Sequence, residues 1–449
     1  MESIDMLLFV LLALFAVFPY IRGYKVTAMV IFFFFLTGGF NLIPDELVDL
    51  GVPLTKNADY AFFILLFFLI IESFCTKKFL HIDTYVKYLI VFFSFLFLCI
   101  IFNRFSIGVG WGEILRTVRY LFFLLAYFVF RSLDRAQLIG LLKVLFSVTI
   151  FISVLYLLQL VVGTNILDAT QQSEAVFLGT VFPRFYNQPD MIQFFAIMAI
   201  YCNPFRGKMK IISTTILILA LLGAFHRSLI GFFVLSLLIG WILSLSKLRQ
   251  IQIFTVGSFL AVFIIIFAGH RFTQSRTYID LQKVMSGNFA EMEIDVTDLS
   301  ESTFTFRIAH LFERNQYLLE NPKAMLLGAG LFTEDSKKID KMFDFKVGLI
   351  EELSSKVVQV DTGDISYSGL LLRFGYLGTI LNLFLFFYLM FYFFKNREDK
   401  YAKFSFLYLV LTFGISFFSA NLIIPVTFLM PMISYLIVEK GKTDTKELT

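Results

Sequence analysis

Runs of about twenty apolar residues recur along this chain of 449 residues, and they restrict its fold more than any other feature. Each run is long enough to cross a hydrocarbon core of about 30 Å as a helix. Hydrophobic residues make up 58% of the sequence, more than a soluble domain of this length has interior to bury. Helices satisfy their own backbone hydrogen bonds in lipid, and the alternation typical of barrel strands is missing from these runs. The sequence therefore predicts an all-α polytopic membrane protein.

We predict about thirteen transmembrane helices (twelve to fourteen) in a single integral membrane domain over residues 1–449. The cores of the predicted spans are 6–21, 27–44, 59–75, 87–103, 113–131, 137–162, 190–203, 210–224, 228–245, 252–269, 365–394, 403–419 and 422–438. The gap around Asn421 is very short, so the alternative to two separate final spans is a single broken pair of helices. The start of the chain is acidic, whereas a cleavable signal peptide begins with basic residues, so we expect none.

The loops between these runs alternate in charge. Basic loops stay on the cytoplasmic side of a membrane, and every second loop here is basic. The basic residues of these loops, taken loop by loop, are Arg22 and Lys25; Lys77 and Lys78; Arg131 and Arg135; Arg206, Lys208 and Lys210; Lys247 and Arg249; Lys395, Arg397 and Lys400; and Lys440 and Lys442. The intervening loops, 45–49, 106–112, 163–190 and 270–363, are acidic or neutral. This pattern predicts a multi-pass protein of the bacterial cytoplasmic membrane, with the N-terminus outside and the C-terminus cytoplasmic.

The stretch 270–363 is the longest segment not dominated by apolar residues, and the predicted topology makes it a large extracytoplasmic loop. Its ionisable residues are the natural place to look for chemistry. They include Arg271, Arg276, Arg307, His310, Arg314 and Asp361, with Asp364 just beyond.

Several further arginines fall on the predicted outer side, against the usual charge distribution. Arg104, Arg184 and Arg227 lie in or beside outer loops, and Arg116 and Arg119 lie in the outer half of the fifth predicted span. A cation within a span costs roughly 2.5–3.5 kcal/mol on insertion scales, so it usually faces a polar cavity or a partner. The alternative for Arg116 and Arg119 is snorkelling to the nearby interface.

Within the long loop, the residues from Ser302 to Asn321 predict a helix capped by Ser302 or Thr303 and ended by Asn321-Pro322. Steps of three and four place Arg307, His310 and Arg314 on one face, near Tyr317. The adjoining apolar face comprises Ile308, Leu311, Phe312, Leu318 and Leu319. Such a helix would direct its basic stripe at anionic groups at the membrane surface. The alternative is a solvated charged face with ordinary packing behind it.

Two short segments after this helix are further candidates. Gly328-Ala329-Gly330 has the backbone freedom to bring amides near a phosphate. Asp361 and Asp364 precede the next span, where either carboxylate would accept a proton from a hydroxyl or would cap the helix. No cluster of Asp, Glu, His or Cys has metal-ligand spacing, so we expect neither a metal nor another cofactor. The net charge of +4 is spread over loops, and we expect no nucleic-acid partner.

The chain resembles the Wzy-type O-antigen and capsule polymerase and ligase superfamily. Four blocks occur in the order typical of that family, spanning roughly residues 160–385. They are Gly179-Thr180 to Asp190 with Arg184, Arg227-Ser228, Arg307 through Asn321-Pro322 to Gly330, and Asp364 to Gly375-Tyr376-Leu377-Gly378. The resemblance implies a GT-C-like, metal-independent glycosyltransferase. Its donor would be an oligosaccharide on undecaprenyl pyrophosphate, and its product O-antigen, capsule or exopolysaccharide.

By position, the resemblance gives the role of holding the pyrophosphate to Arg227 and Arg307. Asp364, as a candidate base, and His310, from the loop helix, complete the expected catalytic residues. Substrate binding is expected of Arg184, Arg116, Arg119, Arg314, Asp361 and Tyr367. Guanidinium groups suit this role because their planar fork matches two phosphate oxygens. The expected partners are the lipid-linked oligosaccharide and membrane lipid, and a chain-length regulator and a flippase are candidate protein partners.

One departure from the family pattern bears on the reaction. The ligase branch has a histidine eleven residues before a glycine, and the matching position before Gly375 is Asp364. This favours a repeat-unit polymerase over an O-antigen ligase. A lipid-linked oligosaccharide flippase or other transporter is an alternative from a different class, although its charges should line a midplane cavity. A third is a non-enzymatic assembly partner.

Overall fold

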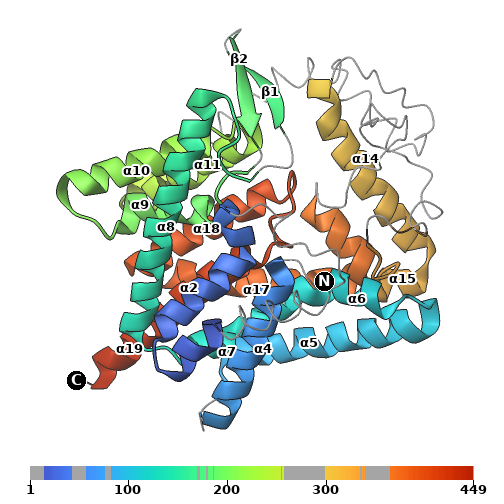
Figure 1. The fold of residues 1–449 in the computed structure, drawn as a ribbon. Helices are drawn as coiled ribbons and strands as arrows, with labels where there is room; N and C mark the ends of the chain where they lie inside the picture. The colour runs from blue at the N-terminus through green and yellow to red at the C-terminus, as the bar shows by residue number, and fades with distance from the viewer. Residues whose placement is uncertain are drawn as a thin grey trace.

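A computed structural model describes residues 15–42, 57–75, 82–168, 172–177, 180–185, 187–253, 255–256, 299–333, 336, 338 and 365–447. These residues form helices and one β-hairpin (Figure 1). The α-helices are α2 (Lys25–Leu36), α4 (Asn57–Cys75), α5 (Thr84–Phe102), α6 (Trp111–Phe122), α7 (Ala126–Arg131), α8 (Arg135–Val162), α9 (Ile192–Cys202), α10 (Gly207–Leu222), α11 (Arg227–Leu243), α14 (Leu299–Glu320), α15 (Pro322–Leu327), α17 (Ser366–Lys395), α18 (Lys400–Ile415) and α19 (Pro425–Glu447). Short turns of other helix types are η1 (Gly38–Asn41), η2 (Asn103–Ile107) and η3 (Phe123–Leu125).

Three described helical stretches are long and apolar enough to cross a membrane: Thr84–Ile107, Arg135–Val162 and Ser366–Lys395. Lys25–Leu36, Ile192–Cys202 and Arg227–Leu243 are shorter apolar helices. The prediction of apolar spanning helices is confirmed to this extent. The stretch predicted as one span over 113–131 contains the short turn η3, which separates α6 from α7. The last two predicted spans are two separate helices, α18 and α19.

The prediction of a purely helical chain is wrong at one place. Strands β1 (Gln172–Phe177) and β2 (Thr180–Phe185) pair antiparallel, with Ser173 opposite Arg184. Val, Thr and Phe are frequent in these strands, and such residues favour a pleated backbone over a helix. The hairpin lies beyond the end of α8, outside the helical bundle (Figure 1).

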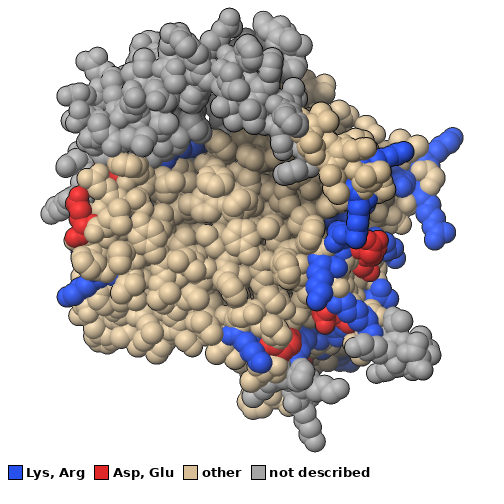
Figure 2. Space-filling model, turned by 180° about the vertical axis from the view of Figure 1, so that it is seen from behind, with Lys and Arg blue, Asp and Glu red and all other residues tan. Residues whose placement is uncertain are grey.

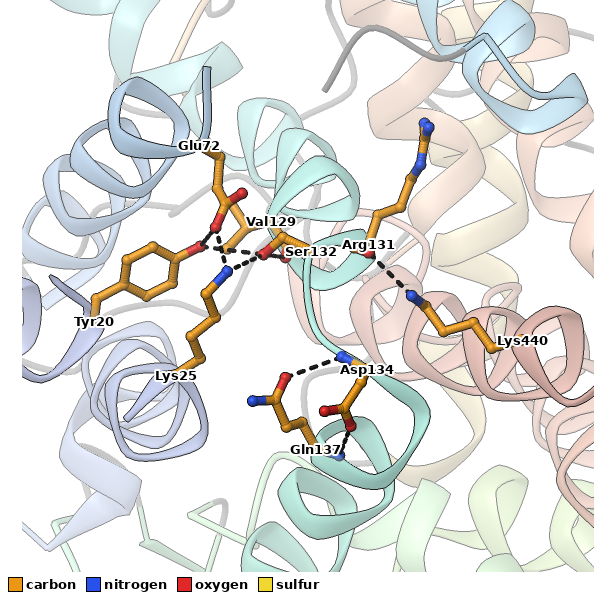
Figure 3. A network of polar contacts seen from close by, with 9 residues as sticks. All are labelled: Tyr20, Lys25, Glu72, Val129, Arg131, Ser132, Asp134, Gln137 and Lys440. Carbon is orange, nitrogen blue, oxygen red and sulfur yellow. Dashed lines mark hydrogen bonds and ion pairs between the residues drawn. The ribbon is translucent and has the colours of Figure 1, made fainter. Parts of the chain in front are cut away.

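The predicted basic loops meet at one end of the bundle, which we call the basic end. Lys25 Nζ on α2 lies 2.6 Å from Glu72 Oε1 on α4 and donates to Ser132 Oγ after α7 (Figure 3). Lys440 on α19 donates to the Arg131 carbonyl oxygen, and Lys403 on α18 donates to Ser244 Oγ after α11. Side chains of α2, α4, α18 and α19, together with those of Ser132 and Ser244, therefore hold this end together.

The acidic and neutral connections meet at the opposite end, which we call the loop end. Asn41 donates to the carbonyl oxygens of Asn187 and Gln188. Ser366 Oγ at the start of α17 donates to the Ser419 carbonyl oxygen and accepts from the Leu422 N–H. The predicted sorting of loops into two sets is thus confirmed for the described residues.

The surface between the two ends is apolar. Figure 2 shows a broad face almost free of charged side chains, with Lys and Arg gathered mainly along its right-hand margin. Large apolar side chains on the bundle surface, such as Phe97, Phe151 and Phe391, are more than half exposed. An exposed apolar surface of this extent suits contact with lipid.

Candidate functional site

The loop helix α14 packs on the start of α17 at the loop end. It begins at Leu299, so Ser302 and Thr303 lie within it and the predicted cap is wrong. The predicted end at Asn321-Pro322 is confirmed, because α14 stops at Glu320 and α15 starts at Pro322.

The polar face of α14 is directed into the protein. His310 is 2% exposed, and its Nδ1 lies 2.6 Å from Ser368 Oγ on α17. One turn further on, Arg314 is 1% exposed, and Tyr376 on α17 donates to Asn315. Leu319, which was expected on the apolar face, is exposed instead. The alternative of a solvated basic stripe is therefore wrong for His310 and Arg314, which pack between α14 and the neighbouring protein.

Arg314 is held in this buried position by an ion pair with the neighbouring Glu313. Burial lowers the pKa of Arg314 to about 10, and the attraction of Glu313 opposes that change. The guanidinium consequently stays charged at neutral pH. An ion pair with little access to water mainly fixes position, because its Coulomb attraction is offset by desolvation.

Arg307 differs from Arg314 in having no such partner. It lies on the same helix, two turns before Arg314, and is partly exposed. Its Nε is buried without a hydrogen-bond partner, and no described carboxylate lies within 4 Å of its guanidinium. Among the described residues, Arg307 is therefore a cation on a fixed helix that retains donors for an anion.

His310 makes the stability of this helix contact depend on pH. Burial, together with the charge of Arg314, lowers the pKa of His310 well below its ordinary value of about 6.5. The unfolded chain then binds a proton below pH 6.5 that the folded protein excludes, so stability is complete above pH 6.5 and is lost as the pH falls. We therefore expect this group to lower the free energy of unfolding progressively as the pH falls below 6.5. His310→Asn, which keeps an amide near Ser368, should flatten the profile of thermal midpoint against pH between 7 and 5.5, and parallel profiles would contradict the assignment.

The turn after α15 packs closely against α17 at Gly375, where the backbone of α17 departs from helical geometry. Gly328 has a φ of 84°, and a Cβ there would lie 2.3 Å from the Arg373 carbonyl oxygen. Gly375 within α17 has a φ of 63°, and a Cβ there would lie 2.6 Å from the Met325 carbonyl oxygen. The Ala329 N–H donates to the Leu372 carbonyl oxygen. The glycines therefore allow two backbones to pack together.

Two more amides, in and just after this turn, also have partners. The Leu331 N–H donates to Asn103 Oδ1 at 2.7 Å, and the Thr333 N–H donates to Glu113 Oε1. The suggestion that this turn offers its amides to a phosphate is wrong for Ala329 and Leu331, since both amides bind other parts of the protein.

Asn103 is the residue that joins this turn to α5. It is fully buried in η2, where its amide donates to the Cys99 carbonyl oxygen and its Oδ1 accepts from Leu331. Asn103→Ala leaves the Leu331 N–H buried without a partner, so we expect a loss of about 1–3 kcal/mol of stability. Ser147→Ala, which removes an exposed hydroxyl bonded within α8, is the control and should leave the thermal midpoint unchanged. Equal midpoints for both variants would contradict this role.

The two arginines of the predicted fifth span have different environments. Arg119 Nη1 on α6 lies 2.7 Å from Asp59 Oδ1 on α4, and its guanidinium lies over the Tyr120 ring. Arg116 is exposed and, among the described residues, donates to the Gly112 carbonyl oxygen of its own helix. Arg119 thus has a structural partner, and snorkelling suits Arg116. Their substrate-binding roles stay predictions.

The remaining predicted residues are distributed around the loop end. Arg227 is exposed at the start of α11, where His226 Nδ1 accepts from the Leu229 N–H. Tyr367 is buried and donates to the Phe413 carbonyl oxygen on α18. Only the backbone of Arg184 is described, in β2. Asp361, Asp364, Arg271, Arg276 and residues 6–14 and 257–298 lie outside the described residues.

The structure thus places Arg307, His310 and Arg314 on α14, which packs on α17. Tyr367 lies at the start of α17, and its side chain contacts α18. Arg227 lies at the same end, at the start of α11. Helix α18 packs on both α11 and α17 and so connects Arg227 to this region. Sequence reasoning missed Asn103 and Ser368. The polar run Ser366-Tyr367-Ser368 before an apolar stretch was the available signal for Ser368.

Among the described residues, no three His, Cys, Asp or Glu side chains are grouped as metal ligands would be. Neither a protein-family model nor a curated protein sequence matches this chain.

Proposed function

We propose that this chain is a polysaccharide repeat-unit polymerase of the bacterial cytoplasmic membrane. It would act on undecaprenyl-pyrophosphate-linked oligosaccharides at the outer face, with about thirteen spans, the N-terminus outside and the C-terminus in the cytoplasm. In that orientation the loop end faces outward, and the basic end faces the cytoplasm. The family resemblance supplies the substrate class, and the sorting of charge between the two ends supports the orientation.

The single observation that carries the proposal is the state of Arg307. It is partly buried, it lies on a helix fixed by the His310–Ser368 contact, and it has no carboxylate partner among the described residues. A preorganised cation of this kind stabilises an anion without first having to break an ion pair. The exposed Arg227 at the same end is the second proposed phosphate ligand.

In the proposed reaction, an acceptor hydroxyl attacks the anomeric carbon of the donor glycan. The bond from that carbon to the pyrophosphate oxygen breaks, and a new carbon–oxygen bond to the acceptor forms. Negative charge grows on the departing pyrophosphate, where Arg307 and Arg227 would stabilise it. The hydroxyl proton passes to a base, for which Asp364 is the candidate. His310, closed to solvent and bound to Ser368, would position α14.

The glycan profile of cells that lack this protein tests the proposal. Loss of long chains with single repeat units still attached to the cell surface supports a polymerase. Loss of all attached glycan would instead indicate a ligase, and lipid-linked units trapped on the cytoplasmic face would indicate a flippase. Unchanged chain length in Arg227→Ala and Arg307→Ala would indicate a non-enzymatic assembly partner.

A further inference from the structure

A second cationic site lies at the basic end, remote in sequence from α14. It is a cavity of about 300 Å³ lined by parts of α8, the α9–α10 connection and the start of α18. Lys143, Arg206 and Lys400 contribute its positive charges. None of the three has a carboxylate within 4 Å among the described residues, and the described lining contains no acidic residue.

The connection that forms one wall of this cavity is rigid. Asn203 donates to Ser213 Oγ at 2.9 Å and to Thr214 Oγ1 at 3.0 Å, and it accepts from the Phe205 N–H. Thr214 in turn donates to the Ala199 carbonyl oxygen on α9. These bonds fix the backbone on either side of Arg206, so its position does not depend on a ligand.

The start of α10 lies next to the cavity, directly after the lining residue Arg206. No side chain caps the first turn of α10. The unsatisfied N–H groups of a helix start attract anions, especially beside a guanidinium. Three cations without a carboxylate partner among the described residues, beside a helix start without a side-chain cap, together favour a phosphate group over a neutral ligand.

The opposite wall of the cavity is apolar. Ile139 and Leu142 of α8 and Met198 of α9 line it. Lys143 lies about 12 Å along α8 from the start of the helix, so its charge is at the depth of an interface rather than in bulk water. On α10, just beyond Arg206, Met209 and Ile211 are more than half exposed, as expected of a surface that contacts lipid chains.

We infer that this cavity binds the phosphate of an anionic phospholipid in the leaflet at the basic end. The three cations would hold the headgroup, and the apolar wall would receive the upper part of an acyl chain. Basic pockets between membrane helices are known sites for anionic headgroups. This inference is independent of the proposed polymerase activity, because it concerns a different end of the bundle and a different ligand.

Native mass spectrometry of the full-length protein tests the inference. The protein is titrated with phosphatidylglycerol or phosphatidylcholine carrying identical acyl chains. We expect preferential binding of phosphatidylglycerol, and an affinity reduced roughly 30-fold in Arg206→Gln/Lys400→Gln, because both lost cations line the cavity and would contact the headgroup phosphate directly. Lys208→Gln/Lys210→Gln loses the same charge outside the cavity and should bind like the wild type.

Equal binding of both lipids would overturn the inference. Equal weakening by the two double variants would also overturn it, because it would show only attraction to the general charge of this end. Displacement of the lipid by millimolar inorganic phosphate would assign the cations to free phosphate rather than to a headgroup. If the double variant does not fold, Lys143→Gln serves in its place, since Lys143 is an exposed side chain.

Discussion

Arg307→Ala is expected to reduce the rate of glycan polymerisation by roughly 10²–10³, the usual effect of removing one preorganised donor from a developing anion. Arg307→Lys should recover only part of this loss, because an ammonium group retains the charge and lacks the planar fork for two oxygens. Because the guanidinium makes no described ion pair, alanine breaks no structural contact of that kind. The measurement is the rate of chain growth from a lipid-linked repeat unit by the purified protein.

The control for this prediction is Lys323→Ala. Lys323 is an exposed cation at the start of α15, close in sequence to the same site. Lys323→Ala removes one positive charge from the loop end, as Arg307→Ala does, and we expect it to polymerise at the wild-type rate. Full activity of Arg307→Lys would remove the argument from two-oxygen geometry, and full activity of Arg307→Ala would remove Arg307 from the reaction.

Gly375→Ala is expected to prevent normal folding of the loop end. Gly375 has φ 63° and ψ −167°, a conformation essentially confined to glycine, and its strain for another residue is of order 1–3 kcal/mol. The added Cβ would also lie 2.6 Å from the Met325 carbonyl oxygen and 2.8 Å from that of Ala324. Both neighbours are backbone atoms, so neither can rotate away. We expect little monodisperse protein on size-exclusion chromatography and a strongly lowered thermal midpoint.

Gly140→Ala is the matched control. Gly140 lies within α8, and a Cβ there meets nothing within 4 Å. Alanine is favoured over glycine inside a helix by roughly 0.5–1 kcal/mol, so this variant should be as stable as the wild type or more so. If Gly375→Ala and Gly140→Ala have the same thermal midpoint, the close backbone packing between α15 and α17 contributes nothing to stability.

The features of the fold that depend on hydrophobicity and charge were predictable from sequence. Long apolar runs predicted α5, α8 and α17, and the alternation of charged loops predicted which connections lie at the same end. The break at η3 was not predictable, because an apolar 3₁₀ turn has the same composition as the helices beside it. The β-hairpin was missed since its strands were assigned to a loop by polarity alone.

In the candidate site, residue spacing correctly grouped Arg307, His310 and Arg314 on one side of a helix. It did not reveal that this side faces the protein, because amphipathicity cannot distinguish solvent from a polar neighbour such as Ser368. The glycines after α15 were noticed for their backbone freedom, and their role was assigned to a ligand rather than to packing. The hydrogen bond between Asn103 and Leu331 was not predictable, because residues so distant in sequence share no local sequence pattern.

The most direct test of the account is the affinity of the purified full-length protein for geranylgeranyl pyrophosphate, a short analogue of the lipid carrier. We predict saturable binding to the wild type and a dissociation constant raised at least about tenfold in Arg307→Ala, since a charge-assisted bond contributes roughly 1.5–3 kcal/mol. Lys323→Ala should match the wild type. The same dissociation constant in all three proteins would contradict the claim that Arg307 holds the phosphate end of the substrate.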